Sequence, residues 1–200
     1  MSPVAVTTHR LGMYRWGCVA LVVVVAGCSA PVYESTPPDV VASALSAAGP
    51  RSLDYAKVWT VVFDTNVPSW RADVVRSALA EWQTAAPCGV SFVVTTGATL
   101  PDVLGVWPAP GTIEVRMEAE LEDGKSTGIG FWYPNGGSRI TFQIGASDAD
   151  FPRVARHELG HAFHLPHNDA APSLMSGTTD TCRTIQPADV ATYAAVWCPN

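Results

Sequence analysis

The apolar residues of the chain repeat with two different periods, and these periods predict alternating strands and helices. A run of β-branched and aromatic residues at 57–63 is typical of a strand. Apolar side chains then recur at every fourth position from Val74, which predicts a helix that Ser69 can cap and that ends at Ala86-Pro87. The pattern therefore opens with a strand followed by an amphipathic helix.

Later segments predict four more strands and two more helices. We expect the strands at residues 90–95, 113–117, 128–133 and 139–144. Asn135-Gly136 lies between the last two strands and is a strong hairpin signal, because both residues accept positive φ angles. A helix is expected at 151–164, and Pro187 begins a short terminal helix. This order of elements predicts an α+β domain at 51–200.

Composition supports a compact domain and argues against several other classes. The chain has 200 residues, of which 48% are hydrophobic and 15% charged, so it is neither a disordered acidic tail nor a coiled coil. The formal net charge is −6, and the 12 basic residues are scattered along the chain. Because binding to phosphates needs a basic patch, we do not expect nucleic acid as a partner.

The first part of the chain is predicted to be a lipoprotein signal peptide at residues 1–27. Basic residues precede an apolar run at 16–26 that is too short to span a bilayer comfortably, an order typical of secretory signals. The run ends in Val-Ala-Gly before Cys28, which is similar to a bacterial lipobox and implies a lipid anchor on that thiol; ordinary secretion is the alternative. Residues 28–50 are expected to form a flexible tether. The protein is therefore expected to be exported and anchored to the membrane, facing outside the cytoplasm.

The cysteines suggest one disulfide in that oxidising compartment. Cys18 would leave with the signal peptide and Cys28 would be lipidated, so three cysteines remain in the domain. Cys182 and Cys198 bracket the terminal helix, and we predict that they pair. Spacing does not exclude the two pairings that involve Cys88.

Histidine is concentrated in one segment of the chain. Four of the five histidines lie within eleven residues, at His157, His161, His164 and His167. The first two are separated by four positions, so a helix projects both rings from one face toward a common Zn²⁺. Glu158 lies beside the first ring, where a carboxylate can reach a metal-bound water and act as a general base. This arrangement predicts a catalytic metal site.

The third metal ligand is expected to be His167. His164 lies seven positions after His157, about 10 Å along a helix axis, which is too far for one tetrahedral ion. Pro166 ends the helix, so the chain can turn back and bring His167 to the metal. Three protein ligands leave one position for water, as in catalytic zinc sites.

Residues 157–167 are similar to the metzincin pattern H-E-x-x-H-x-x-G-x-x-H, and Met175 lies in a segment that looks like the Met-turn of these peptidases. The order of elements also resembles that of the matrixins and the small snapalysin-type proteases. The resemblance implies a mixed, mostly parallel five-stranded sheet, an active-site helix and a short C-terminal helix. It also implies that substrate lies along the edge strand at 127–133, and that Met175 lies beneath the metal without binding it.

One residue departs from the family pattern. His164 occupies the position of the family's glycine, whose positive φ angle ends the helix, and a histidine there costs about 1 kcal/mol or more relative to glycine. If the helix ended at a different residue, Asp169 would become an alternative third ligand.

The predicted function is that of a monomeric zinc-dependent endopeptidase that hydrolyses exported or extracellular proteins. The alternative is a non-catalytic zinc-binding surface lipoprotein. The acidic segment 118–123 has carboxylates that could bind Ca²⁺, but its spacing matches no Ca²⁺-binding loop and a solvated loop is favoured. Trp107, which lies among prolines, is expected to cap the cleft.

Overall fold

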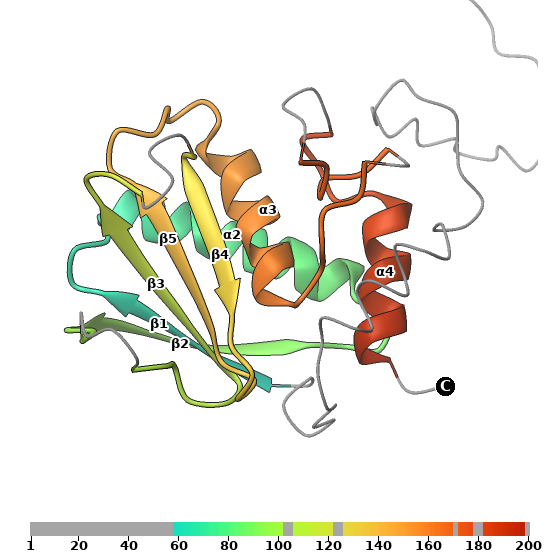
Figure 1. Ribbon diagram of the computed structural model, residues 1–200, viewed down its shortest axis with the longest axis horizontal. Coiled ribbons are helices and arrows are strands. Elements are labelled where there is room, and N and C mark those ends of the chain that lie inside the picture. Colours follow the sequence, from blue (N-terminus) through green and yellow to red (C-terminus); the bar gives the residue numbers. More distant parts are fainter. Residues whose placement is uncertain (1–57, 102–105, 122–125, 170–171, 178–181, 199–200) are drawn as a thin grey trace, which may run out of the picture.

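The computed structural model describes residues 58–101, 106–121, 126–169, 172–177 and 182–198, and these form an α+β domain. The elements in chain order are β1 (Val58–Asp64), α2 (Ser69–Ala85), β2 (Ser91–Ala98), β3 (Thr112–Glu118), β4 (Gly128–Trp132), β5 (Ser138–Gln143), α3 (Phe151–Ala162) and α4 (Pro187–Trp197) (Figure 1). All the predicted strands and helices are present. Ser69 is the first residue of α2, but it makes no capping hydrogen bond, so that detail of the prediction is wrong.

The five strands form one mixed sheet in the order β2-β1-β3-β5-β4. Neighbouring strands are parallel except β4, which runs antiparallel to β5 through the hairpin at 133–137. The predicted mixed, mostly parallel sheet is therefore confirmed. Because β4 pairs only with β5 among the described strands, its other edge can accept hydrogen bonds from an extended peptide.

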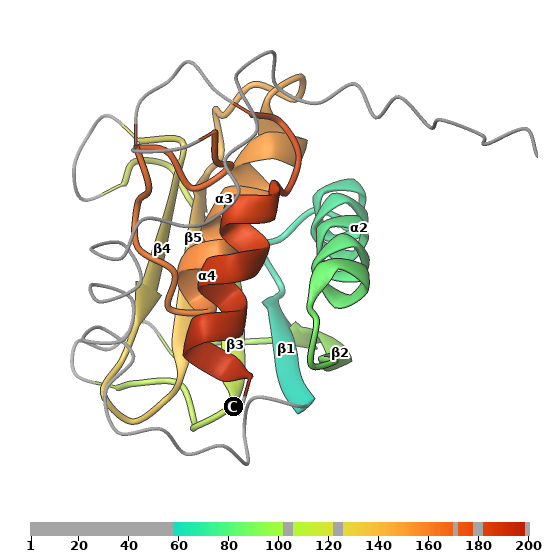
Figure 2. The ribbon, with the colours of Figure 1, turned by 90° about the vertical axis from the view of Figure 1, so that its right-hand side faces the viewer.

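The core lies where α2 and α3 pack against one face of the sheet. β1 alternates in burial, with Trp59, Val61 and Phe63 facing the core, as expected for a half-buried strand. The buried stripe of α2 includes Val75 and Leu79. Figure 2 shows the molecule turned by 90°, with α4 in front of α3 and α2 to one side. These contacts fix α3, which carries the histidines, against the sheet.

Helix α4 lies beyond α3, on the side away from the sheet (Figure 1), and is held there by aromatic side chains. Trp197 makes an edge contact with Trp59, with ring centroids 5.8 Å apart. Its indole N–H donates a 2.6 Å hydrogen bond to the backbone carbonyl of Phe163, directly after α3. Tyr193 packs on Trp82 of α2 at 6.1 Å. The terminal helix therefore fixes the segment where α3 ends.

A disulfide joins Cys88 to Cys198, with their Cα atoms 5.4 Å apart, so the predicted pairing of Cys182 with Cys198 is wrong. Cys88 follows α2 in the sequence, and folding brings it to the C-terminal end of α4. Sequence spacing could not indicate this contact, because 110 positions separate the two cysteines. A bond that closes so long a loop stabilises the folded chain by about 4–5 kcal/mol in the chain-entropy model.

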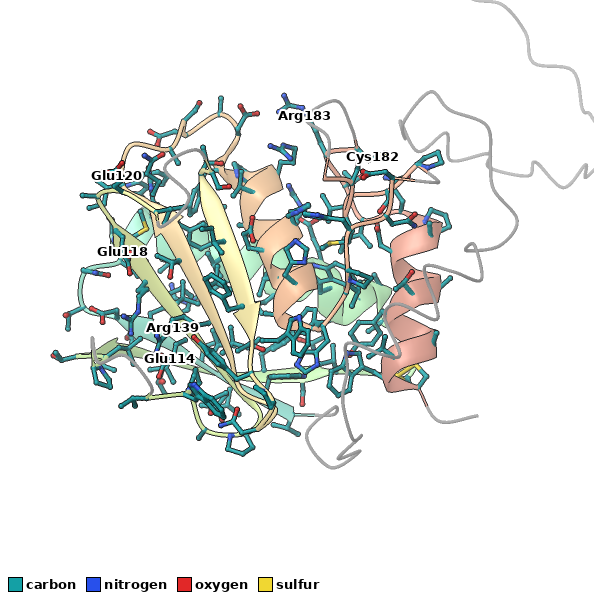
Figure 3. The ribbon with its side chains drawn as sticks, in the orientation of Figure 1. Glu114, Glu118, Glu120, Arg139, Cys182 and Arg183 are labelled. Atoms are coloured by element: carbon teal, nitrogen blue, oxygen red, sulfur yellow. A yellow bond between two sulfur atoms is a disulfide. The ribbon has the colours of Figure 1, made fainter. Side chains whose placement is uncertain are left out.

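On the face of the sheet away from the helices, β3 and β5 are joined by an ion pair. Figure 3 shows Glu114 and Arg139 side by side, and the carboxylate accepts hydrogen bonds of 2.9 and 3.0 Å from the guanidinium. Asn135 of the hairpin donates a 2.7 Å hydrogen bond to the carbonyl of Pro108. This hydrogen bond ties the hairpin to the loop that precedes β3.

The signal peptide at 1–27, the anchor at Cys28 and the tether at 28–50 lie outside the described residues and stay predictions. No helix in the described ranges combines the length and the hydropathy that crossing a membrane requires.

Candidate metal centre

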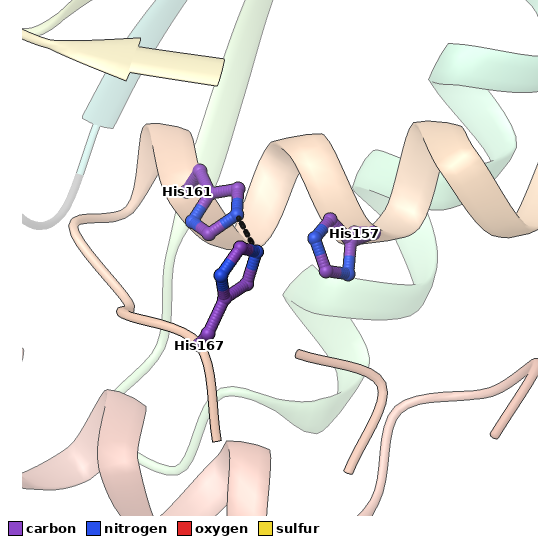
Figure 4. A group of neighbouring side chains, drawn as sticks. All are labelled: His157, His161 and His167. Carbon is purple, nitrogen blue, oxygen red and sulfur yellow. Dashed lines mark hydrogen bonds between the residues drawn. The ribbon is translucent and has the colours of Figure 1, made fainter. Parts of the chain in front are cut away.

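Helix α3 presents two histidines on one face because its other face is committed to the core. Ala155, Leu159 and Ala162 are fully buried against the sheet and α2. His157 and His161 project from the opposite face toward the segment that follows the helix (Figure 4). The separation of four residues places the two rings one turn apart, with centroids 4.8 Å apart.

Helix α3 ends in a Schellman motif centred on His164. The amide of Leu165 donates a 3.0 Å hydrogen bond to the carbonyl of Gly160, and the amide of His164 donates a 2.8 Å bond to His161. His164 has a φ of 63° and is the only non-glycine residue with a positive φ among the described residues. The sharp turn is therefore made in spite of the histidine.

The side chain of His164 is 2% exposed and packs between two tryptophans. Its ring lies 5.2 Å from the ring of Trp132 and 5.2 Å from that of Trp197. These contacts offset the backbone cost expected for a non-glycine residue in the left-handed region. With His164 in the left-handed region, the chain turns back after the helix.

The turn brings His167 back to the two helical histidines. The Nε2 atoms of His161 and His167 are 3.1 Å apart, and one ligand atom from each of the three rings lies within 4.8 Å of the others (Figure 4). The three histidines of the predicted ligand set are thus adjacent, and as a group they could hold a metal ion.

Hydrogen bonds orient two of the rings for metal binding. The Nδ1 of His157 lies 2.7 Å from the carbonyl of Leu174, and the Nδ1 of His161 lies 2.8 Å from the carbonyl of Leu165. A carbonyl only accepts, so we assign the ring proton to Nδ1 in both residues, which leaves Nε2 with its lone pair toward the centre of the group. Three imidazole nitrogens are a donor set that suits zinc.

Burial keeps these two rings neutral. It lowers the pKa of His157 to about 4, helped by the positive charges of His167 and Arg153 and opposed by the bond to Leu174. Burial likewise lowers the pKa of His161 to about 3, together with repulsion from His157. Metal binding needs the neutral imidazole, so both rings are in the required state at neutral pH.

Met175 is buried, and its thioether lies against Gly160 of α3. A Cβ atom on Gly160 would overlap the sulfur of Met175 and lie 2.9 Å from its Cε. Only glycine at this position lets the thioether pack against the helix between His157 and His161. The contact explains the glycine in the sequence His157-Glu-Leu-Gly-His161.

Asp189 fixes the segment that carries Met175, and sequence reasoning missed it. Its carboxylate, 1% exposed, accepts a 2.5 Å hydrogen bond from the hydroxyl of Ser173 and a 3.0 Å bond from the amide of Leu174. It also accepts a 2.7 Å bond from the amide of Gln186 as part of a capping box at the start of α4. The capping pattern was the available signal. Because Leu174 orients the ring of His157, Asp189 connects α4 to the metal centre.

Asp169 is not a member of the histidine group. Its carboxylate accepts a 2.6 Å hydrogen bond from the hydroxyl of Ser176 and a 2.8 Å bond from the amide of Gly177. Gly177 in turn packs on the ring of His167, since a Cβ there would lie 3.0 Å from Nδ1. Asp169 therefore holds the segment that supports His167.

A cleft of about 730 Å³ lies over the histidines, between β4 and α3. Glu158 lines it, and β4 approaches this side chain closely because residues 128 and 130 are glycines. A Cβ on Gly128 would lie 2.9 Å from Cγ of Glu158, and one on Gly130 would lie 2.9 Å from its carbonyl oxygen. Sequence analysis missed these glycines, although two glycines in a short predicted strand were a signal for close approach.

Two further sequence predictions concern residues near this region. Trp107 does not line the cleft; it stacks on Tyr133 at 5.8 Å and is 50% exposed, so its predicted capping role is wrong. Within the described ranges, the three histidines are the one group of potential metal ligands. Part of the acidic segment 118–123 lies outside those ranges, and Ca²⁺ binding there stays without support.

No protein-family model matches the chain, and no curated protein sequence is significantly similar to it. Among solved structures, archaemetzincin from Methanopyrus kandleri is similar at 16% identity over 74% of this chain and 97% of that one, with a TM-score of 0.47. A chain of the GM1-bound form of the ECX AB5 holotoxin is similar at 14% identity over 70% of each chain, with a TM-score of 0.43. At these values neither likeness assigns an activity.

Proposed function

We propose that the protein is a zinc-dependent metalloendopeptidase of metzincin type that hydrolyses exported or extracellular proteins. The observation that carries the proposal is the histidine group: ligand atoms of His157, His161 and His167 lie within 4.8 Å of one another, at the floor of a cleft that Glu158 also lines. Three imidazole donors beside a carboxylate are what metal-assisted hydrolysis requires.

The number of ligands favours catalysis over a structural role. Structural zinc sites are closed by four protein ligands, whereas catalytic sites use three and leave one position open. The group contains three histidines among the described residues, and Asp169 is engaged with Ser176 and Gly177. The open position would face the cleft.

Each residue then has a defined part in peptide hydrolysis. A bound zinc ion would polarise the scissile carbonyl and lower the pKa of water toward 7. Glu158 would take a proton from the attacking water and pass it to the leaving amine, as a general base and then a general acid. The edge of β4 that faces away from β5, which pairs with no other described strand, would hold the substrate as an added strand, with the substrate backbone along the cleft.

The test uses the full chain, stripped with a chelator and reloaded with zinc. We expect one zinc ion per chain and cleavage of casein or a quenched peptide that stops on chelation. Glu158→Gln should keep the zinc and lose at least 100-fold in kcat. A variant that cleaves as fast as the wild type would exclude Glu158 as the base.

The alternative, a non-catalytic zinc-binding surface lipoprotein, gives a different result. That protein would bind zinc but would neither cleave peptides nor bind a hydroxamate through an open position. Hydroxamate affinity therefore separates the two functions even when the physiological substrate is not known.

The location is proposed from the sequence pattern at the start of the chain. Export with a lipid anchor on Cys28 predicts that the protein partitions with membranes and that Cys28→Ala is released from them. Mass spectrometry of the mature N-terminus would identify either the lipid or an unmodified secreted end.

A further inference from the structure

The cleft contains a basic residue that the proposed chemistry does not use. Arg153 lines the cleft and lies four residues before His157, so both side chains extend from the same face of α3. Four residues of helix correspond to about 6 Å. The guanidinium is thus within reach of substrate groups one or two residues from the bond to be cleaved.

The acidic residues that line the cleft, Asp150 and Glu158, each have another role and do not pair with Arg153. Asp150 forms an ion pair with Arg183 at 3.3 Å, and Figure 3 labels Arg183 near the first turn of α3. Glu158 is the proposed base. Within the part of the chain that the structure describes, no carboxylate lies within ion-pair distance of Arg153.

Other arginines of the domain show what a structural role looks like. Arg71 donates to three backbone carbonyls, Arg139 pairs with Glu114, and Arg156 makes two hydrogen bonds to Glu81. Among the residues that the structure describes, the side chain of Arg153 has no comparable partner, and it lines the cleft instead. A guanidinium in that position suits a planar, bidentate anion, and a carboxylate is the one a peptide supplies.

The direction of β4 indicates which part of a substrate reaches Arg153. Gly128 lies against Val154 and Gly130 against His161, so β4 runs along α3 in the same direction. Antiparallel pairing is the commoner arrangement, and it would direct the C-terminal half of a bound peptide toward the beginning of α3. The residues that follow the scissile bond would then lie beside Arg153.

We propose that Arg153 selects substrates with a carboxylate at the first or second residue after the scissile bond. The carboxylate is either an Asp or Glu side chain or the terminal carboxylate of a short C-terminal segment. This selectivity rests on the proposed peptidase function and names the substrate class that the cleft prefers.

The test compares matched quenched peptides on the zinc-loaded full chain. One pair carries Glu or Gln after the cleaved bond with an amidated C-terminus. A second pair carries Gln there and differs only in a free or amidated C-terminus placed two residues on. We expect a kcat/KM about tenfold higher for the carboxylate member of one pair, and the responding pair identifies the source of the anion.

Substitutions of Arg153 then test whether this residue causes the preference for a carboxylate. The measured quantity is the ratio of kcat/KM between the two peptides of the responding pair. Arg153→Gln should reduce the ratio to about one, Arg153→Lys should keep most of it, and Arg153→Glu should favour a Lys-containing peptide. Arg76→Gln, on the exposed side of α2, is the matched control and should keep the ratio. A role limited to tuning His157 would change both members of a pair equally and leave the ratio intact.

Binding measurements keep this inference separate from the peptidase proposal. Affinities of the same peptides for Glu158→Gln, and for that variant combined with Arg153→Gln, are measured by fluorescence anisotropy. If no peptide is cleaved, the peptidase proposal fails while the affinity ratio still tests Arg153. An absent carboxylate preference in the wild type, or one that survives Arg153→Gln, would overturn the inference.

Discussion

Gly160 lies directly against the thioether of Met175, so closely that a methyl group on the glycine would overlap the sulfur. Gly160→Ala should therefore weaken zinc binding about tenfold, because Met175 must move and shift the segment that orients His157. In an unstrained helix the same substitution stabilises the fold by about 1 kcal/mol. A loss of zinc affinity in Gly160→Ala would therefore come from the overlap with Met175 and not from a weaker helix. Competition with a chelating dye measures the affinity. Gly145→Ala, whose Cβ would meet nothing within 4 Å, is the control.

The absence of a side chain at Gly128 leaves space for the side chain of Glu158 between β4 and α3. Gly128→Ala introduces a methyl group 2.9 Å from Cγ of Glu158 and 2.7 Å from Cγ1 of Val154. We expect kcat to fall by about tenfold or more while zinc content stays at one per chain, because the base is displaced and the ligands are not. Steady-state kinetics with metal analysis checks this. An alanine variant with wild-type kcat would show that β4 does not position the base.

His164 combines backbone strain with buried packing, and two variants separate the two effects. His164→Ala keeps the left-handed strain and loses the contacts with Trp132 and Trp197, so it should destabilise by about 2–4 kcal/mol. His164→Gly loses the same contacts but relieves the strain, and should be about 1 kcal/mol more stable than the alanine variant. Urea unfolding of both proteins measures the difference, and an alanine variant as stable as the glycine variant would argue against strain.

Asp189 is expected to matter for both stability and metal binding. Asp189→Ala leaves the hydroxyl of Ser173 and the amides of Leu174 and Gln186 buried without this acceptor, which should cost about 2–4 kcal/mol. Zinc affinity should fall as well, since Leu174 no longer fixes the ring of His157. Asp73→Ala, at an exposed ion pair on α2, should change neither quantity measurably.

The stability of the metal-free protein should depend on pH through His157 and His161. The pKa of His157 is lowered to about 4 and that of His161 to about 3, whereas an unfolded chain has histidine pKa values near 6.5. Between pH 6.5 and 4 the unfolded state therefore binds more protons, and the free energy of unfolding falls as the pH falls. The slope approaches about 1.4 kcal/mol per pH unit for each histidine.

Thermal unfolding of the chelated protein from pH 7.5 to 4 measures this dependence. In His157→Gln the free energy of unfolding should depend less steeply on pH, because glutamine does not titrate and the contribution of one histidine to the slope is lost. A stability that stays constant across this range would show that the rings are not buried in neutral form.

Much of the local structure of the site follows from short-range pattern. The separation of four residues between His157 and His161 places both rings on one face of any helix, and Pro166 prevents that helix from continuing to His167. The strands, the hairpin at Asn135-Gly136 and the helix from Pro187 follow in the same way, because each depends on residues a few positions apart.

Residues that act through distant contacts could not be found in this way. Cys198 pairs with Cys88 and not with Cys182, because the end of α4 folds back onto the connection after α2. Likewise Asp189 connects to His157 through Leu174, which lies fifteen positions earlier.

The sequence by itself determined the order of the elements and the identity of the chemical groups, because helical and strand periodicity are properties of neighbouring residues. Tertiary structure alone decided how His164 accommodates its positive φ angle, how closely Gly128 approaches Glu158, and that Arg153 faces the cleft without a carboxylate partner among the described residues. Packing and ion pairing join residues far apart in the chain, and their distances are set only when the sheet and helices assemble.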